Sequence, residues 1–121
     1  LNTKKNKKYL KLWGTGKPKR ELMYVDDVAE ACIYFMNKKT KHSLINIGSG
    51  EEKTIKQYAD FVVKKINSKL KIKFDQNRSM DGTPRKILDC SLARSYGWKP
   101  KFSLKKGFMI TYNDFLRKKL F

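Results

Sequence analysis

The sequence has few of the residues on which metal centres and nucleophilic enzymes depend. Its 121 residues include one histidine, His42, and two cysteines, Cys32 and Cys90, which lie far apart and form no CxxC motif. Their spacing does not match a zinc site, and no GxSxG nucleophile motif is present. We therefore expect neither a metal site nor a catalytic residue in this chain. The two separated cysteines fit a reducing, cytoplasmic compartment.

Long apolar runs are also missing. No stretch approaches the roughly 18 consecutive apolar residues of a membrane helix, and no signal peptide is visible, so we expect no membrane partner. The chain has the length of one domain, and it begins with Leu1 rather than methionine. We expect it to be a piece of a longer protein.

Acidic residues are scarce, because 11 Asp and Glu stand against 29 Lys and Arg, for a net charge of +18. Such a charge makes nucleic acid a candidate partner. However, most of the basic residues are lysines spread along the whole chain, whereas sites that read bases favour the two-pronged arginine. We interpret most of these lysines as solvated and do not expect nucleic acid as a partner, with a small basic nucleic-acid-binding domain as the alternative.

Alternating strand-like and helix-like segments predict an α/β fold with three to four helices against a small sheet. Short strands are expected at residues 10–13, 20–25, 43–47 and 71–74. Residues 1–9 are polar and basic, and we expect them to form a flexible lead-in to a single domain, residues 10–121.

Four helices are expected from their capping residues. They begin at Asp26, at a capping box of Thr54 and Gln57, at Asp89 and at Ser103. Tyr24 with the Asp26–Asp27 pair could instead act as acid and base, but a helix cap explains the pair more simply. The expected apolar faces of the first, second and last helices are Val28, Ala29, Cys32, Ile33 and Met36; Ile55, Tyr58, Ala59, Val62 and Ile66; and Leu104, Phe108, Tyr112, Phe115 and Leu116.

The stretch WGTGKPKREL, residues 13–22, looks like a phosphate-binding glycine loop but satisfies neither common motif. A P-loop requires Ser or Thr after Gly-Lys, and here Pro18 follows Lys17. A dinucleotide fingerprint requires a third glycine and a following helix, and neither is present. We interpret this stretch as a tight turn between two strands.

Two arginines and an aspartate nevertheless provide the groups of a nucleotide-diphosphate site. Arg20 follows the glycine turn, while Asp81 and Arg85 lie in a loop, residues 75–88, that is long for an ordinary connection. An arginine binds two phosphate oxygens at once, and a carboxylate accepts hydroxyl or base N–H groups. Trp13 either stacks on a base or sugar or belongs to the core. For Arg20, the alternative is an exposed side chain paired with Glu21 or with nothing.

Four segments occur in the same order as in the GDP-L-fucose synthase family: WGTGKPKRELMYVDDVAEAC, INIGSGEEKTI, DGTPRKILD, and GWKP followed by SLKKG. RE-x-x-YVDD and GWKP are shared with many sugar-nucleotide epimerases and reductases of the extended short-chain dehydrogenase/reductases. The combination of WGTGKP…RE with DGTPRK is more specific to the fucose family. The resemblance spans residues 10–116 and departs mildly at Leu22, where the family usually has phenylalanine.

This resemblance implies that the chain is the C-terminal, GDP-sugar-binding part of an oxidoreductase. Members of the family convert GDP-4-keto-6-deoxy-D-mannose to GDP-L-fucose by epimerisation at C3 and C5 and reduction at C4. NADP(H) and the catalytic residues belong to an N-terminal Rossmann half that is absent here, so this chain is expected to bind no cofactor and to be inactive alone. Residues 20–40 are expected to pack partly against that half, and the parent enzyme is expected to be a homodimer.

The resemblance also carries over individual positions. Trp13, Arg20 and Asp81 match substrate-contacting positions of the family, and Arg85 matches the arginine that related epimerases place near the pyrophosphate. Another extended reductase or epimerase, acting on a different sugar nucleotide, is the alternative.

Overall fold

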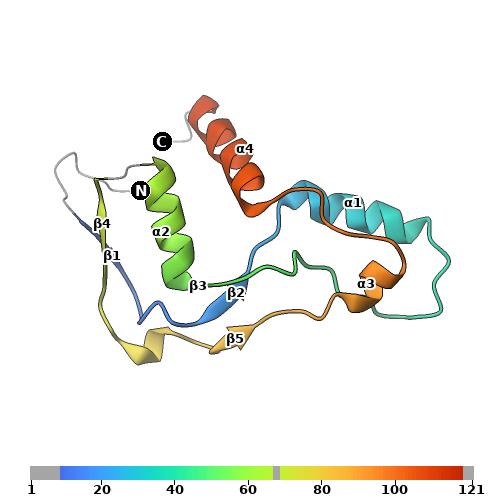
Figure 1. The fold of residues 1–121 in the computed structure, drawn as a ribbon, viewed down its shortest axis with the longest axis horizontal. Helices are drawn as coiled ribbons and strands as arrows, with labels where there is room; N and C mark the ends of the chain where they lie inside the picture. Colours follow the sequence, from blue (N-terminus) through green and yellow to red (C-terminus); the bar gives the residue numbers. More distant parts are fainter. Residues whose placement is uncertain (1–8, 67–68, 119–121) are drawn as a thin grey trace. The chain divides into compact units, whose positions relative to one another are not determined.

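The computed structural model describes residues 9–66 and 69–118 (Figure 1). Helices and strands alternate within these ranges, which confirms the predicted α/β class. The elements are β1 (Tyr9–Leu12), β2 (Lys19–Glu21), α1 (Val25–Met36), β3 (Glu52–Thr54), α2 (Ile55–Ile66), β4 (Lys71–Phe74), the 3-10 helix η1 (Arg78–Met80), β5 (Arg85–Lys86), α3 (Ser91–Ser95) and α4 (Leu104–Arg117). The predicted lead-in, residues 1–9, lies outside the described residues except for Tyr9, which opens β1.

The chain divides into two compact units, which we describe separately. The first contains the segment that ends at Arg20 and the segment Glu52–Lys86. The second contains Glu21–Glu51 and the chain from Ile87 onward.

In the first unit, β1 and β4 form a parallel two-stranded sheet (Figure 1). Successive side chains of a strand point to opposite faces, so the register divides the pair into two sets. The half-buried set, on the face toward the core, is Leu10, Leu12, Ile72 and Phe74; the exposed set is Tyr9, Lys11, Lys71 and Lys73. The strands predicted at residues 10–13 and 71–74 are therefore confirmed.

Helix α2 begins at the predicted capping box. The Gln57 side chain accepts a hydrogen bond from the Thr54 N–H at 2.8 Å, and the Thr54 hydroxyl accepts one from the Gln57 N–H at 3.1 Å. Tyr58 is buried and its hydroxyl donates to the carbonyl of Arg20 at 3.1 Å, which ties the helix to β2. Ile66, predicted on the same face, is 47% exposed.

A second sheet of the first unit has the strand order β3–β2–β5. Strands β2 and β5 are parallel, with Lys19 opposite Arg85 and Arg20 opposite Lys86. The segment predicted as a long loop, residues 75–88, thus contains a strand as well as η1, which Asn77 caps by accepting from the Ser79 N–H at 3.1 Å.

The core of the second unit is built on Ala31, Ala93 and Trp98. Met23, Tyr34, Phe35, Ile45 and Ile47 pack against them. The apolar face predicted for α1 is therefore wrong, because Ala31 faces this core while Val28, Ile33 and Met36 are exposed. The helix is apolar on more than one side, and spacing alone does not tell which side the protein covers.

Two further boundaries differ from the prediction. Residues 43–47 form no strand, and although Ile45 packs on the core, Leu44 is 76% exposed. A strand needs a neighbouring backbone, and within the described residues none pairs with this segment. The strand predicted at residues 20–25 ends at Glu21, so that α1 begins at Val25.

Asp26 is not the N-cap of α1. The N-cap is Tyr24, whose side chain makes no cap hydrogen bond, and Asp26 lies in the first turn. Asp27 is 1% exposed and accepts hydrogen bonds from the backbone N–H groups of Lys101 and Phe102, at 2.8 and 3.1 Å. Its carboxylate thus holds the segment before α4 against α1.

The last helix follows its predicted cap, whereas the N-cap of α3 is Cys90 rather than Asp89, and the Cys90 side chain makes no cap hydrogen bond. Asp89 accepts from the Ser91 N–H at 2.9 Å at the start of α3, and Gly97 ends that helix with a φ of +91°. Ser103 caps α4 by accepting from the Lys106 N–H at 3.3 Å. None of the helices within residues 9–66 and 69–118 has the length and apolar character needed to cross a membrane.

Candidate functional site

The glycine turn after β1 uses its own N–H groups within the protein. Gly14 and Gly16 adopt φ values of +77° and +74°, which only glycine accepts readily. The Gly14 N–H donates to Asp75 Oδ1 at 2.9 Å, and the Thr15 N–H donates to Asp81 Oδ1 at 2.7 Å. Two carboxylates therefore occupy the N–H groups that a phosphate loop would offer to its ligand, in agreement with a turn.

Asp81 is held by this turn. Its second carboxylate oxygen accepts from the Thr15 hydroxyl at 2.7 Å, and a side chain at Gly14 would collide with Asp81 Oδ1. The hydrogen bonds from the Thr15 hydroxyl and N–H lower the pKa of Asp81 below its ordinary value. Asp81 is thus ionised at neutral pH and positions the loop that follows it.

Arg20 holds the same loop from the other end. Its guanidinium donates to the carbonyls of Thr83 at 2.7 Å, Lys19 at 2.8 Å and Asp81 at 3.4 Å. Within the described residues no carboxylate pairs with it, so its positive charge is not neutralised by a side chain. The alternative of a pair with Glu21 is wrong, because Glu21 has other partners.

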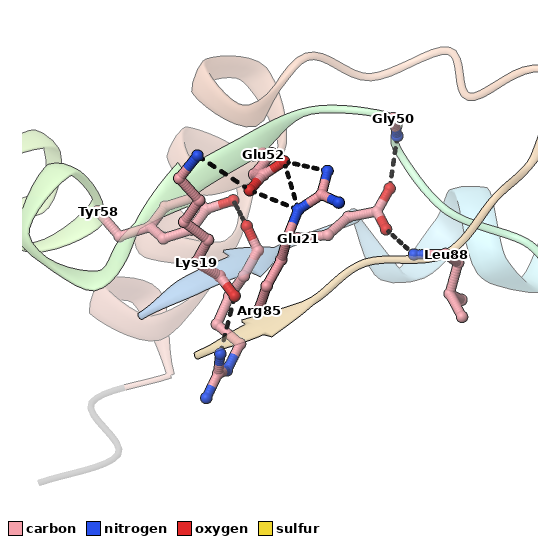
Figure 2. Close-up of polar contacts among 8 residues, drawn as sticks. Lys19, Glu21, Gly50, Glu52, Tyr58, Arg85 and Leu88 are labelled. Carbon is pink, nitrogen blue, oxygen red and sulfur yellow. Dashed lines mark hydrogen bonds and ion pairs between the residues drawn. The ribbon is translucent and has the colours of Figure 1, made fainter. Parts of the chain in front are cut away.

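Arg85 belongs to an ion-pair network in which two cations share one carboxylate (Figure 2). Arg85 donates to both oxygens of Glu52, with a shortest distance of 2.8 Å, and Lys19 Nζ lies 3.4 Å from Glu52 Oε1. The hydrogen bonds from Arg85 lower the pKa of Glu52, and the same contact raises that of Arg85. In this arrangement Glu52 occupies the guanidinium that the sequence assigned to a pyrophosphate.

The register of β2 and β5 separates the cations into two pairs. Lys19 and Arg85 are opposite each other and both reach Glu52, so they share one face of the sheet. Arg20 and Lys86 are also opposite each other and, by the alternation of strands, lie on the other face. The structure therefore brings Arg20 together with Lys86 rather than with Arg85.

Lys86 is a candidate that the sequence reasoning missed. It is exposed, and within the described residues it forms no ion pair. Arg85 and Lys86 are adjacent, so in a strand they would point to opposite faces. This alternation could not be used while residues 75–88 were interpreted as a loop.

Trp13 is an exposed side chain directly after β1. It is 76% exposed, whereas Trp98 is 3% exposed in the core of the second unit. The core alternative for Trp13 is therefore wrong, and its ring is available for stacking.

Glu21 has a structural role in the second unit. Its carboxylate accepts from the Gly50 N–H at 2.5 Å and from the Leu88 N–H at 3.3 Å (Figure 2). A side chain at Gly48 would stand 2.5 Å from Glu21 Oε1 and 2.9 Å from Cys90 Sγ. Glu21 thus joins two segments that are far apart in the sequence, and Gly48 leaves room for it.

Comparison with known proteins shows which families and structures this chain resembles. Residues 1–48 match the NAD dependent epimerase/dehydratase family. The chain is 44% identical over 105 residues to putative GDP-L-fucose synthase 2 of Arabidopsis thaliana, covering 87% of this chain and 32% of that protein. Among solved structures it resembles a GDP-6-OMe-4-keto-L-xylo-heptose reductase from C. jejuni, with a TM-score of 0.82 and 34% identity over 92% of this chain and 34% of that one. It also resembles the UDP-glucose 4-epimerase of Thermotoga maritima, with a TM-score of 0.78 and 30% identity over 93% of this chain and 36% of that one.

The chain has the fold of the C-terminal part of an extended short-chain dehydrogenase/reductase. Its sequence resembles GDP-L-fucose synthases, as the order of its motifs predicted. The chain spans about a third of the length of the curated relatives it matches.

The chain also contains a Tyr-x-x-x-Lys spacing that the sequence reasoning overlooked, Tyr34 and Lys38 in and after α1. The Tyr34 hydroxyl donates to the carbonyl of Tyr96 at 2.7 Å, and Lys38 Nζ lies 5.6 Å from the centroid of the Tyr34 ring. Tyr34 thus fastens α1 to the end of α3, and Lys38 lies against its ring, so we assign both a structural role. No group of three or more His, Cys, Asp or Glu side chains within residues 9–66 and 69–118 is placed to hold a metal ion.

Proposed function

We propose that this chain is the GDP-sugar-binding part of an NADP-dependent enzyme of the GDP-L-fucose synthase type. In the parent enzyme, GDP-4-keto-6-deoxy-D-mannose is converted to GDP-L-fucose by epimerisation at C3 and C5 and reduction at C4. The similarity to GDP-L-fucose synthases and to a GDP-sugar reductase supports this choice of nucleotide.

The observation that carries the proposal is the cation pair of Arg20 and Lys86 on one face of the β3–β2–β5 sheet. Arg20 is oriented by three backbone carbonyls, which leave its charge uncompensated, and Lys86 is its neighbour across the strands. An oriented guanidinium beside an ammonium suits the two phosphates of a nucleotide diphosphate. Trp13 is the proposed stacking group, and Asp81 supports the site by fixing the loop that Arg20 holds.

Arg85 could bind the pyrophosphate only in an arrangement that differs from the observed one. Its guanidinium is paired with Glu52, so a pyrophosphate would have to replace that carboxylate. Because Arg20 needs no such exchange, we assign it the larger share of the binding energy.

The chain's own part in the reaction is to bind and orient. None of the groups assigned here is a nucleophile or a proton carrier, so the binding energy of the nucleotide positions the sugar for groups elsewhere in the parent. The glycine turn does not fit a dinucleotide, because Asp75 and Asp81 already occupy its N–H groups. NADP(H) is therefore assigned to the N-terminal Rossmann half.

That half is also the proposed partner of α1. Val25, Ile33 and Met36 are 66%, 61% and 83% exposed on this helix, and Leu44 is 76% exposed in the segment after it. Apolar side chains gathered on one helix and the following segment mark an interaction surface. We propose that residues 20–40 pack on the Rossmann half, and that the parent is a cytoplasmic homodimer.

Binding of GDP, UDP and dTDP to the 121-residue chain, measured by isothermal titration calorimetry, tests the nucleotide. We expect a preference for GDP, and we expect Arg20→Ala to weaken GDP binding about 10- to 100-fold, as for the loss of a charge-assisted contact. Lys39→Gln, an exposed lysine of the other unit, is the control and should leave binding unchanged.

A preference for UDP or dTDP would support the alternative, another extended reductase or epimerase. An unchanged affinity in both Arg20→Ala and Lys86→Gln would remove the cation pair from the site. In the intact enzyme the same Arg20 variant is expected to raise the KM for the GDP-sugar.

A further inference from the structure

The outer face of the β1–β4 sheet carries three lysines and a tyrosine and has no use in the proposed function. The register places Tyr9 opposite Lys71 and Lys11 opposite Lys73 on this face, and all four side chains are exposed. We call these four residues the β1–β4 basic face.

The charge of this face is not compensated. None of the eight residues of β1 and β4 is acidic, and within the described residues Lys11, Lys71 and Lys73 form no ion pair. The next acidic residue, Asp75, turns its carboxylate to the N–H groups of Gly14 and Asn77. The face therefore has the local positive field that attracts a polyanion.

The geometry of the face suits a single nucleic-acid strand. Alternate residues of a strand are about 6.6 Å apart and neighbouring strands about 4.8 Å apart, so the three ammonium groups can reach successive phosphates. Tyr9 is 48% exposed on the same face, and Lys73 Nζ lies 4.4 Å from the centroid of its ring. A positively charged surface combined with an exposed aromatic ring is the common feature of sites that bind single strands.

We propose that the β1–β4 basic face binds single-stranded nucleic acid through its phosphates, with Tyr9 stacking on a base. Lysine contacts phosphates as a point charge, and phosphate contacts carry no sequence information, so we expect little sequence preference. The lysine-rich composition alone did not indicate such a site; three lysines without ion pairs and an exposed ring on one sheet face do.

Fluorescence anisotropy of a labelled 12-nucleotide oligo-dT or oligo-rU with the 121-residue chain tests the proposal. The variant Lys11→Gln/Lys71→Gln/Lys73→Gln removes the charge of the face, and Lys39→Gln/Lys41→Gln/Lys105→Gln removes three exposed lysines of the other unit. Both variants lower the net charge from +18 to +15, since each loses three charges. Far-UV circular dichroism checks that both remain folded.

We expect the face variant to lower the slope of log K against log salt by about 2, because each phosphate contact of a single strand contributes about 0.7. If the plots of log K against log salt for the face variant and the unchanged chain converge near 1 M salt, this difference in slope corresponds to about 100-fold weaker binding at about 0.1 M salt. Tyr9→Leu should weaken binding about tenfold through the loss of stacking. The control variant should change the slope far less, and GDP should not compete.

Three results would overturn the proposal. Equal losses in the face and control variants would mean that net charge alone binds the strand. Duplex DNA, or vesicles of phosphatidylcholine and phosphatidylserine, binding more tightly than the single strand would point to a different occupant. Absence of binding at about 0.15 M salt would leave the face without a nucleic-acid partner. Because GDP binding is measured at Arg20 and Lys86, each of these results leaves the proposed function untouched.

Discussion

The substitution Asp27→Asn is the most direct test of how the second unit is held together. The two oxygens of Asp27 accept one backbone N–H each, from Lys101 at 2.8 Å and from Phe102 at 3.1 Å, and the side chain is 1% exposed. Asparagine has nearly the same shape but only one acceptor oxygen. Its amide N–H group would then face a backbone N–H group, and one partly buried donor would lose its partner.

The expected cost follows from these two contacts. A hydrogen bond to a charged group contributes about 1.5–3 kcal/mol, and a buried donor without a partner costs a similar amount. Because water can reach the segment around Lys101, which is exposed, the lost hydrogen bond and the unpaired donor should not add fully. We expect a total destabilisation of about 2–3 kcal/mol. For a chain of this length, that corresponds to a fall in Tm of about 8–12 °C.

Thermal and urea unfolding followed by circular dichroism measure this change. The midpoint of urea unfolding should fall with an unchanged m value, which indicates a loss of stability in the native state. Asp26→Asn is the matched control, because this neighbouring carboxylate is exposed. Its interactions are a hydrogen bond with Tyr24 and a place in the first turn of α1, so it should change stability by less than about 1 kcal/mol. If Asp27→Asn unfolds at the same temperature as the control, the carboxylate does not hold residues 101–102, and this account of the second unit is wrong.

Two further predictions concern the first unit. The pKa of Glu52 is lowered on folding, chiefly by the hydrogen bonds from Arg85, so its ionised form stabilises the fold above its ordinary pKa, and this contribution is lost as the pH falls through the lowered value. Glu52→Gln should therefore flatten the decline of Tm between about pH 5 and pH 3 without abolishing it, since Asp81 keeps a lowered pKa; an unchanged decline would contradict the network. Thr54→Ala should destabilise the chain by about 1 kcal/mol through the loss of the cap of α2, measured by urea unfolding with the exposed Thr83→Ala as control, and equal midpoints would show that the cap contributes nothing.

Local features of this chain could be predicted well from the sequence. The capping box of Thr54 and Gln57 and the cap at Ser103 involve residues three positions apart, so their geometry depends on nearby backbone alone. The need for glycine in the glycine turn was also interpreted correctly, because positive φ values at Gly14 and Gly16 require glycine whatever surrounds them, although β1 and β2 do not pair across it. In each case the neighbouring residues suffice to determine the structure.

Features that depend on distant partners could not be predicted in this way. The spacing of α1 gave an apolar face, but the core selects Ala31, because Ala93 and Trp98 are supplied from sixty residues away. Residues 43–47 have the composition of a strand and no backbone to pair with in the described part of the chain. Asp27 was interpreted only as part of an acidic pair at a helix start, and only the structure shows that its carboxylate is used by residues 101–102.

The candidate site shows most clearly why register mattered. In the sequence, Arg20 and Arg85 were the natural pair, because arginine is the better ligand for phosphate. The observed register sets Arg85 opposite Lys19, where Glu52 neutralises both, and leaves Arg20 with Lys86. A shift of β5 by one residue would exchange the two faces, bringing Arg85 beside Arg20 and Lys86 beside Glu52. Which cations can bind an anion is thus decided by a pairing between segments sixty residues apart, and the ion pairs of Glu52 help to hold that pairing in place.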